Sequence, residues 1–189
     1  NPTIYQIADC VVNEVSIDFD IDGIATANWS GFGQIITEAS SMPTATIYEG
    51  TAAADTNNFI RNRLTDLTVT AVAAGDIQTA YSLTLTGGNV TIGNNISFLT
   101  PETLGIVNQP LGHVTGTRNV AGNFTCYLNT PASGASSADL FEDIIESTSV
   151  VTNDFNLVFV VGGTVAHTAG GPSFKITLPT CHLEVPTHS

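Results

Sequence analysis

Three aspartates at alternating positions form the densest group of chemically capable side chains in this sequence. They stand in Asp18-Phe-Asp20-Ile-Asp22-Gly23, which matches the start of an EF-hand calcium loop. The twelfth position of such a loop supplies a bidentate acid, whereas this chain has Trp29 there. Successive residues on one face of a strand lie roughly 6.6 Å apart, too far for the three carboxylates to share one ion. The segment therefore predicts a row of like charges along a strand, and we expect no metal site.

The histidines and cysteines suggest no second chemical centre. None of the four histidines stands at metal-ligand spacing from another histidine or from a cysteine. Cys181 and His182 are adjacent, so a strand would point them to opposite faces. The signatures of serine hydrolases, zinc proteases and phosphate-binding loops do not occur, and no carboxylate pair is singled out for glycoside chemistry. We therefore expect no enzyme and no cofactor, with the three cysteines as free buried thiols.

The chain contains only three arginines, so each one is a notable candidate for an ion pair. Alternation through Phe59–Leu64 would place Arg61 and Arg63 on one face, and the third arginine is Arg118. Because carboxylates are plentiful, we expect each arginine to form a bidentate ion pair. The pairs could lie within one subunit or between subunits. Together with Glu102, these arginines are candidates for structural or inter-subunit ion pairs.

Composition excludes several functions. The formal net charge is −13, with 4 Lys+Arg against 17 Asp+Glu, so the chain cannot build a basic groove for nucleic acid or dock on an anionic membrane. Disorder is excluded because 42% of the residues are hydrophobic and the mean hydropathy is +0.21. No apolar run is long enough to form a membrane-spanning helix. The length and the lack of a linker predict one domain over residues 1–189.

Alternation is the dominant period, and it positions the aspartates. Val15, Ile17, Phe19 and Ile21 point to one side of a strand, whereas Ser16 and the three aspartates point to the other. Gly23 permits a turn, and Ile24–Ser30 reads as the returning strand. The glycine pair Gly87-Gly88 is expected to be a turn. Further strands are predicted at Leu67–Ala73, Tyr81–Thr86, Asn89–Ile92, Ile96–Leu99, Gly122–Leu128, Phe155–Val161 and Phe174–Leu178. The pattern predicts an antiparallel β-sandwich or barrel with long hairpins.

One segment has the helical period instead. Leu140, Phe141, Ile144 and Ile145 recur at helical spacing, and Ser136 precedes Asp139 by three residues as in a capping box. We expect one flanking amphipathic helix that packs these four apolar residues on a sheet.

Several long strings resemble the tail tube proteins of tailed bacteriophages. Val12–Gly31 resembles the first long hairpin of that family, and the resemblance continues through Phe59–Thr65, Leu83–Gly105 and Gly112–Leu128. The expected helix at Ser136–Glu146 falls where the family has one. The resemblance covers well over half of the chain.

This resemblance implies a β-sandwich or barrel subunit with a flanking helix. It also implies that six subunits close into a ring, that rings stack into a tube, and that DNA leaves the capsid through the lumen without specific binding. Implied partners are further copies, the terminator, the baseplate or tip, and a sheath where the tail contracts. The implied location is the tail of the virion, after assembly in the cytoplasm of the bacterial host. Family members usually begin upstream of this hairpin, so an N-terminal segment is expected to be missing here.

The acidic composition suits such a conduit, because carboxylates that line a bore repel phosphate. We therefore hypothesise that Asp18, Asp20 and Asp22 face the lumen. Three groups of alternatives remain open at this point. A tube of a tailocin or contractile secretion system would share the fold, and an adhesin or carbohydrate-binding module would share the strands. A binding module would normally expose a cluster of aromatics, whereas this chain has one Trp and four Tyr. A jelly-roll hydrolase would need a metal or a carboxylate pair.

Overall fold

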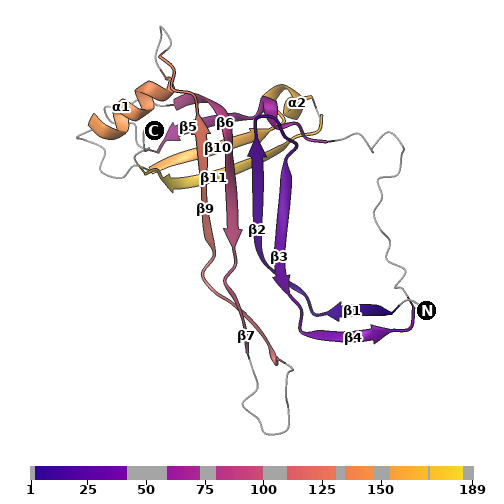
Figure 1. Cartoon of the computed structure of the whole chain (residues 1–189). Helices are drawn as coiled ribbons and strands as arrows, with labels where there is room; N and C mark the ends of the chain where they lie inside the picture. The colour runs from indigo at the N-terminus through magenta and orange to yellow at the C-terminus, as the bar shows by residue number, and fades with distance from the viewer. Residues whose placement is uncertain are drawn as a thin grey trace. The chain divides into compact units, whose positions relative to one another are not determined.

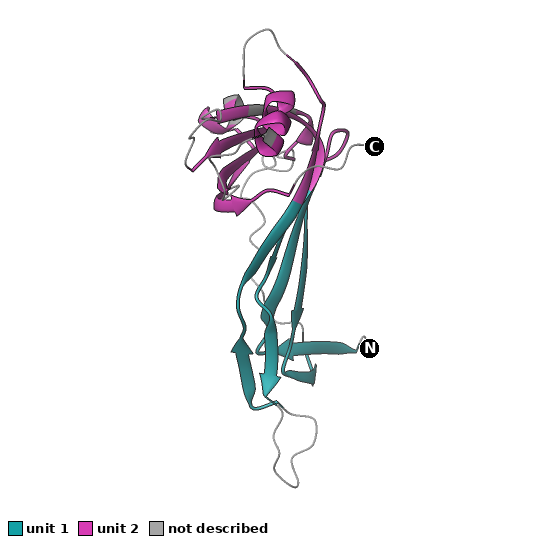
Figure 2. Ribbon diagram, turned by 90° about the vertical axis from the view of Figure 1, so that its left-hand side faces the viewer, with its two compact units in different colours: residues 1–18, 26–57, 89–122 teal, residues 19–25, 58–88, 123–189 magenta. Residues whose placement is uncertain are grey.

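The structure of the chain is a computed structural model that describes residues 3–41, 59–72, 80–99, 110–130, 135–146, 154–169 and 171–184. Strands dominate these residues, which confirms the mainly β antiparallel class. The chain divides into two compact units, coloured in Figure 2. Unit 1 comprises Asn1–Asp18, Thr26–Asn57 and Asn89–Gly122, and unit 2 comprises Phe19–Ala25, Asn58–Gly88 and Asn123–Ser189. The single domain over residues 1–189 stays a prediction.

The elements of the described residues follow one another as in Figure 1. None of the described helices is long and apolar enough to cross a membrane. The strands are β1 Ile4–Ala8, β2 Val11–Asp20, β3 Thr26–Phe32, β4 Ile35–Ala39, β5 Asp66–Ala71, β6 Ala80–Gly93, β7 Ile96–Leu99, β8 Gly112–Thr115, β9 Asn119–Cys126, β10 Asp154–Val161 and β11 Phe174–His182. The helices are the 3-10 turn η2 Asn62–Leu64, α1 Ser137–Glu146 and α2 Thr164–Thr168.

Unit 2 has its core on one face of a sheet in which β11, β10, β5 and β6 are successive neighbours. Phe159 of β10 lies opposite Leu67 of β5, which lies opposite Leu83 of β6. These three side chains share a face and are 2%, 1% and 4% exposed. The rings of Phe19 and Phe124 lie 5.5 and 6.4 Å from the ring of Phe159. The aromatic cluster therefore ties β2 and β9 to β10 within this unit.

Helix α1 begins at the expected cap. The Ser136 backbone N–H and hydroxyl donate to Asp139 Oδ2 at 2.8 and 2.7 Å, and the Asp139 N–H donates back to Ser136 Oγ at 3.2 Å. This reciprocal pair satisfies backbone donors that the first helical turn leaves free. The predicted apolar stripe varies in burial: Leu140 is buried, Phe141 and Ile144 are half-buried, and Ile145 is 53% exposed. The hydroxyl of buried Tyr81 donates to Asp143 and fastens the helix to β6.

The prediction of a turn at Gly87-Gly88 is wrong, because β6 runs unbroken from Ala80 to Gly93. A Cβ on Gly88 would lie 2.6 Å from the carbonyl oxygen of Asn123 and 3.0 Å from the Phe19 ring. Glycine therefore serves close approach of neighbouring strands here. Leu85 and Val90, one on each side of the glycine pair, are both buried.

Unit 1 contains a long antiparallel hairpin. β2 pairs with β3 from Val11 opposite Phe32 to Asp18 opposite Thr26. β1, which precedes β2 in sequence, pairs with β4, which follows β3. The Gln34 N–H donates to the Ala8 carbonyl at 3.1 Å between these two ladders. In Figure 1, β1 and β4 turn aside from β2 and β3. β7 and β8 form a further two-stranded sheet, and the Phe98 ring of β7 lies 5.9 Å from the Phe32 ring.

Candidate functional site

On one face of the unit 1 hairpin, three successive cross-strand pairs are polar: Glu14 opposite Ser30, Ser16 opposite Asn28, and Asp18 opposite Thr26. We call these six residues the polar hairpin face. Residues that alternate with them, such as Val15 and Trp29, are opposite each other on the other side. The separation of polar and apolar residues follows directly from the period of two that the sequence shows.

Asp18 is the carboxylate of the polar hairpin face that accepts side-chain hydrogen bonds from both strands. Asn28 Nδ2 donates to Asp18 Oδ2 at 2.9 Å, and the Ser16 hydroxyl lies 3.3 and 3.4 Å from the two carboxylate oxygens. Asp18 is half-buried, and its partners come from both strands of the hairpin. An ionised carboxylate only accepts hydrogen bonds, so neutral donors fix its direction and leave its charge in place.

The other end of β2 is fixed by an amide cluster. The Asn94 backbone N–H donates to the Asn13 carbonyl at 2.7 Å, and Asn94 Nδ2 donates to the Val12 carbonyl at 3.0 Å. Asn13 Oδ1 accepts from the Ile96 N–H at 2.8 Å. Arg118 joins this cluster, with its Nε donating to Asn94 Oδ1 at 3.1 Å. In the described structure this arginine thus bonds an amide, and it contributes to holding β2 against the end of β6.

The three predicted aspartates occupy different local environments. Asp18 and Asp20 belong to β2, whereas Asp22 lies in the turn beyond the end of that strand. Asp20 and Asp22 are exposed, and Asp20 Oδ1 accepts from the N–H of Ile21 at 2.7 Å. Glu14 was not among the predicted residues, although it is exposed and shares the face of Asp18. Its position four residues before Asp18 in an alternating strand was the signal that could have identified it.

The remaining predicted ion-pair residues are not among the six residues of this face. Arg61 and Arg63 flank the buried residue Asn62 in unit 2, and both are exposed. Within the described part of the chain, neither guanidinium has a carboxylate partner. Glu102 lies outside the described residues, so its predicted role stays a prediction.

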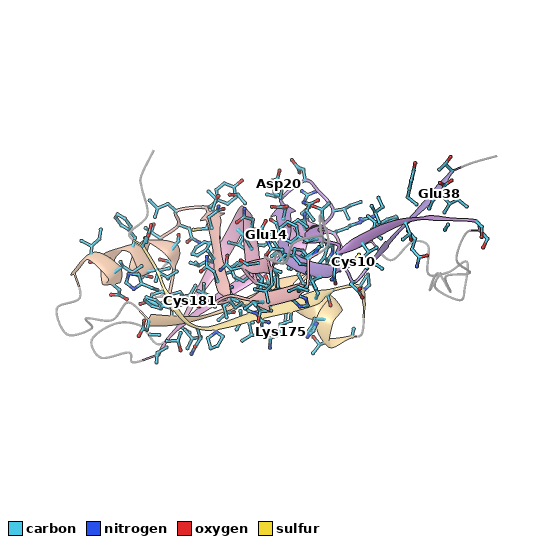
Figure 3. The ribbon with its side chains drawn as sticks, turned by 90° about the horizontal axis from the view of Figure 1, so that it is seen from below. Cys10, Glu14, Asp20, Glu38, Lys175 and Cys181 are labelled. Atoms are coloured by element: carbon cyan, nitrogen blue, oxygen red, sulfur yellow. The ribbon has the colours of Figure 1, made fainter. Side chains whose placement is uncertain are left out.

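Titratable residues outside this face form no reactive centre in the described ranges. No group of three or more His, Cys, Asp or Glu residues there could hold a metal ion. All three cysteines are free; Cys10 is exposed, whereas Cys126 and Cys181 are half-buried. Burial raises the pKa of the Cys126 and Cys181 thiols, which disfavours the reactive thiolate. Figure 3 labels Cys10, which lies in the segment between β1 and β2, and Cys181, which belongs to β11.

Comparison with known proteins agrees with the resemblance to tail tube proteins that the sequence segments show. The family model for phage tail tube proteins matches residues 1–143. The tail tube protein pb6 of Escherichia phage T5 is 31% identical over 185 residues, which cover 96% of this chain and 38% of that relative. The chain thus spans well under half the length of the curated relative it matches. The match covers the long hairpin, β6, β9 and most of α1. On this evidence the chain belongs to the phage tail tube protein family.

Proposed function

We propose that the chain is a structural subunit of a phage tail tube whose copies close into stacked rings around a DNA-conducting lumen. The observation that carries the proposal is the polar hairpin face, on which the carboxylates of Glu14 and Asp18 form no ion pair with a basic side chain among the residues that the structure describes. Membership of the family supports the formation of a tube. The polar and apolar faces of the hairpin support one orientation of the hairpin in that tube, with the polar side toward the lumen and the apolar side toward protein.

Electrostatics favours this orientation. DNA carries one negative charge per roughly 1.7 Å of its axis, and a carboxylate offers no donor to a phosphate oxygen. A wall of fixed carboxylates therefore repels the duplex at short range and leaves no ion pairs to break as it slides. Asp18 would contribute a directed charge, whereas Asp20 and Asp22 would contribute exposed ones. In this proposal the high acidity of the chain serves passage of DNA without binding.

The strand edges offer a means of closing the ring. Among the described strands, β3 pairs with β2 alone and β9 pairs with β6 alone. All seven residues of β3 are exposed. An unpaired strand edge presents backbone donors and acceptors to another chain. We propose that β3 of one copy pairs with β9 of the next, so that the hairpins of about six copies form a continuous barrel, a closed assembly that leaves no edge.

The proposed location and partners follow from membership of the family. The subunit would reside in the tail of the virion after assembly in the host cytoplasm. It would contact other copies and the proteins that terminate the tube or join it to the baseplate or tip. A contractile sheath is a further partner if the tail contracts.

Assembly is tested by electron microscopy of the purified chain together with sedimentation velocity. We expect rings or tubes with a central channel. A chain that stays monomeric at all concentrations, while circular dichroism shows the β fold intact, would contradict the proposal. A Trp29→Asp variant is the matched disruption on β3, since it places charge beside the pairing edge.

The lumen assignment is tested by replacing Asp18, Asp20 and Asp22 with lysine in the phage that encodes the chain. We expect tails of normal length that retain DNA and eject it slowly, because lysines bind phosphate. The matched control places three lysines at other exposed acids, Asp9, Glu142 and Glu184. Normal ejection by the first variant would remove these aspartates from the lumen, while the tube itself could still be seen in micrographs.

A further inference from the structure

The sheet of β1 and β4 exposes an apolar face. Tyr5 lies opposite Glu38 and Ile7 opposite Ile36, so these four side chains project to the same side. Tyr5, Ile7 and Ile36 are 66%, 56% and 67% exposed. We call these four residues the arm face. A two-stranded sheet is at best marginally stable alone in water, so a partner that covers the arm face would stabilise it.

Charge restricts what can cover the arm face. Copies of a chain with net charge −13 repel one another, so contacts between them favour surfaces with few carboxylates or with compensating cations. The arm face carries one carboxylate, that of Glu38, which is exposed and labelled in Figure 3. Its complement is a surface that combines exposed apolar side chains with positive charge.

Unit 2 contains such a surface. The segment that begins at Phe59 lies beside the turn after β2: Ile24 and Arg61 are bridged, and the Ala25 N–H donates to the Ile60 carbonyl at 3.1 Å. Alternation places Phe59 and Arg61 on the same side of this extended segment. Ile24 and Phe59 are 50% and 59% exposed. We call Ile24, Phe59, Arg61 and Arg63 the cationic patch; it holds two of the 4 Lys+Arg of the chain.

We propose that the arm face of one copy docks on the cationic patch of a second copy, with Glu38 paired to Arg61 or Arg63. The two surfaces match in chemistry, since each has exposed apolar side chains and they carry opposite charges. The surfaces differ, so the contact is head-to-tail and repeats from copy to copy. This proposal rests on the proposed function, because it names a contact between tube subunits, and it gives the two arginines a carboxylate partner that they lack among the described residues of their own chain.

Charge reversal provides the first test. Glu38→Arg and the pair Arg61→Glu with Arg63→Glu should each raise the concentration needed for assembly about tenfold, and the three changes combined should restore most of it. The matched controls, Glu184→Arg and Lys175→Glu, make the same kinds of charge change at other exposed positions and should assemble normally. Circular dichroism checks that every variant is folded. Reversals that act no more strongly than their controls would overturn the docking.

Cross-linking between different copies provides the second test. In a Cys10→Ser background, Ile36→Cys chains are mixed with Ile24→Cys chains and oxidised during assembly. We expect a disulfide dimer that contains one chain of each kind, and little dimer from either chain alone. A disulfide within an Ile24→Cys, Ile36→Cys monomer would instead show docking inside one copy and contradict the proposal. If wild-type chains do not assemble at all, the proposed function fails; if they assemble without the mixed cross-link, only the docking fails.

Discussion

Asn28 Nδ2 donates a 2.9 Å hydrogen bond to Asp18 Oδ2 across the β2–β3 hairpin, and this bond directs the carboxylate most firmly held on the polar hairpin face. Neither residue is opposite the other in the ladder; Asn28 pairs with Ser16, and its side chain reaches diagonally toward Asp18. The contact therefore depends on the register of the hairpin as well as on the two residue types.

Replacing Asn28 by aspartate should destabilise the chain, because the donor becomes a second carboxylate at hydrogen-bond distance from Asp18. We expect the free energy of unfolding to fall by about 1–3 kcal/mol at pH 7. Denaturant unfolding measures the change. Asn119→Asp, the same substitution at an exposed position of β9, should be nearly neutral, and equal effects at both sites would refute the role of the bond.

A methyl group on Gly88 should be costly. Its Cβ would meet the Asn123 carbonyl oxygen at 2.6 Å, which is closer than side-chain carbons approach, so a strand must shift. We expect Gly88→Ala to lower the free energy of unfolding by about 1–3 kcal/mol. Gly112→Ala is the matched control, since a Cβ there has no neighbour within 4 Å. Thermal and denaturant unfolding of both variants, measured side by side, would reveal whether the close approach matters; equal stability would show that the strands relax freely.

The capping box of α1 predicts a pH dependence. Hydrogen bonds from the Ser136 side chain and backbone lower the pKa of Asp139 in the folded chain. An acid whose folded pKa lies below its unfolded value stabilises the fold above the unfolded pKa, and the stabilisation is lost as the pH falls through the folded value. Ser136→Ala should cost about 1 kcal/mol at pH 7 through loss of the cap. The difference from wild type should shrink at acid pH. A difference that does not change with pH would exclude the Ser136–Asp139 pair as its source.

Local sequence patterns correctly predicted features that depend on residues close together in sequence, namely the faces of a strand and the start of a helix. The alternation from Val15 to Phe19 indicated the faces of β2, and Ser136 with Asp139 indicated the start of α1. The turn predicted at Gly87-Gly88 failed because glycine serves equally as a turn residue and as a gap for a neighbouring backbone, and the neighbour, β9, lies about thirty residues away in sequence. The partners of Asp18 likewise required the register of β3, which alternation alone does not fix.

The sequence predicted the type of candidate site correctly but only some of the residues that form it. A row of acids on one face of a strand was visible from the sequence, but the point at which β2 ends was not. Asp22 therefore falls in the turn, while Glu14 shares the face of Asp18. The surfaces proposed to join copies could not be predicted from the sequence. Glu38 and Ile36 share a face with Tyr5 and Ile7 only because β4 pairs with β1.

The three thiols should react at different rates, which gives a direct probe of the fold. Cys10 is exposed, whereas burial raises the pKa of Cys126 and Cys181 and partly covers these two residues. Because the thiolate is the reactive form, iodoacetamide at pH 8 should modify Cys10 at least about tenfold faster than the other two. Mass spectrometry of peptides at successive times measures the three rates, and denatured chain supplies the reference in which the rates converge.

Cys10 lies between β1 and β2, close in sequence to the arm face. If copies dock through that face, Cys10 alone should slow further on assembly; uniform rates in the folded monomer would contradict the burial of Cys126 and Cys181.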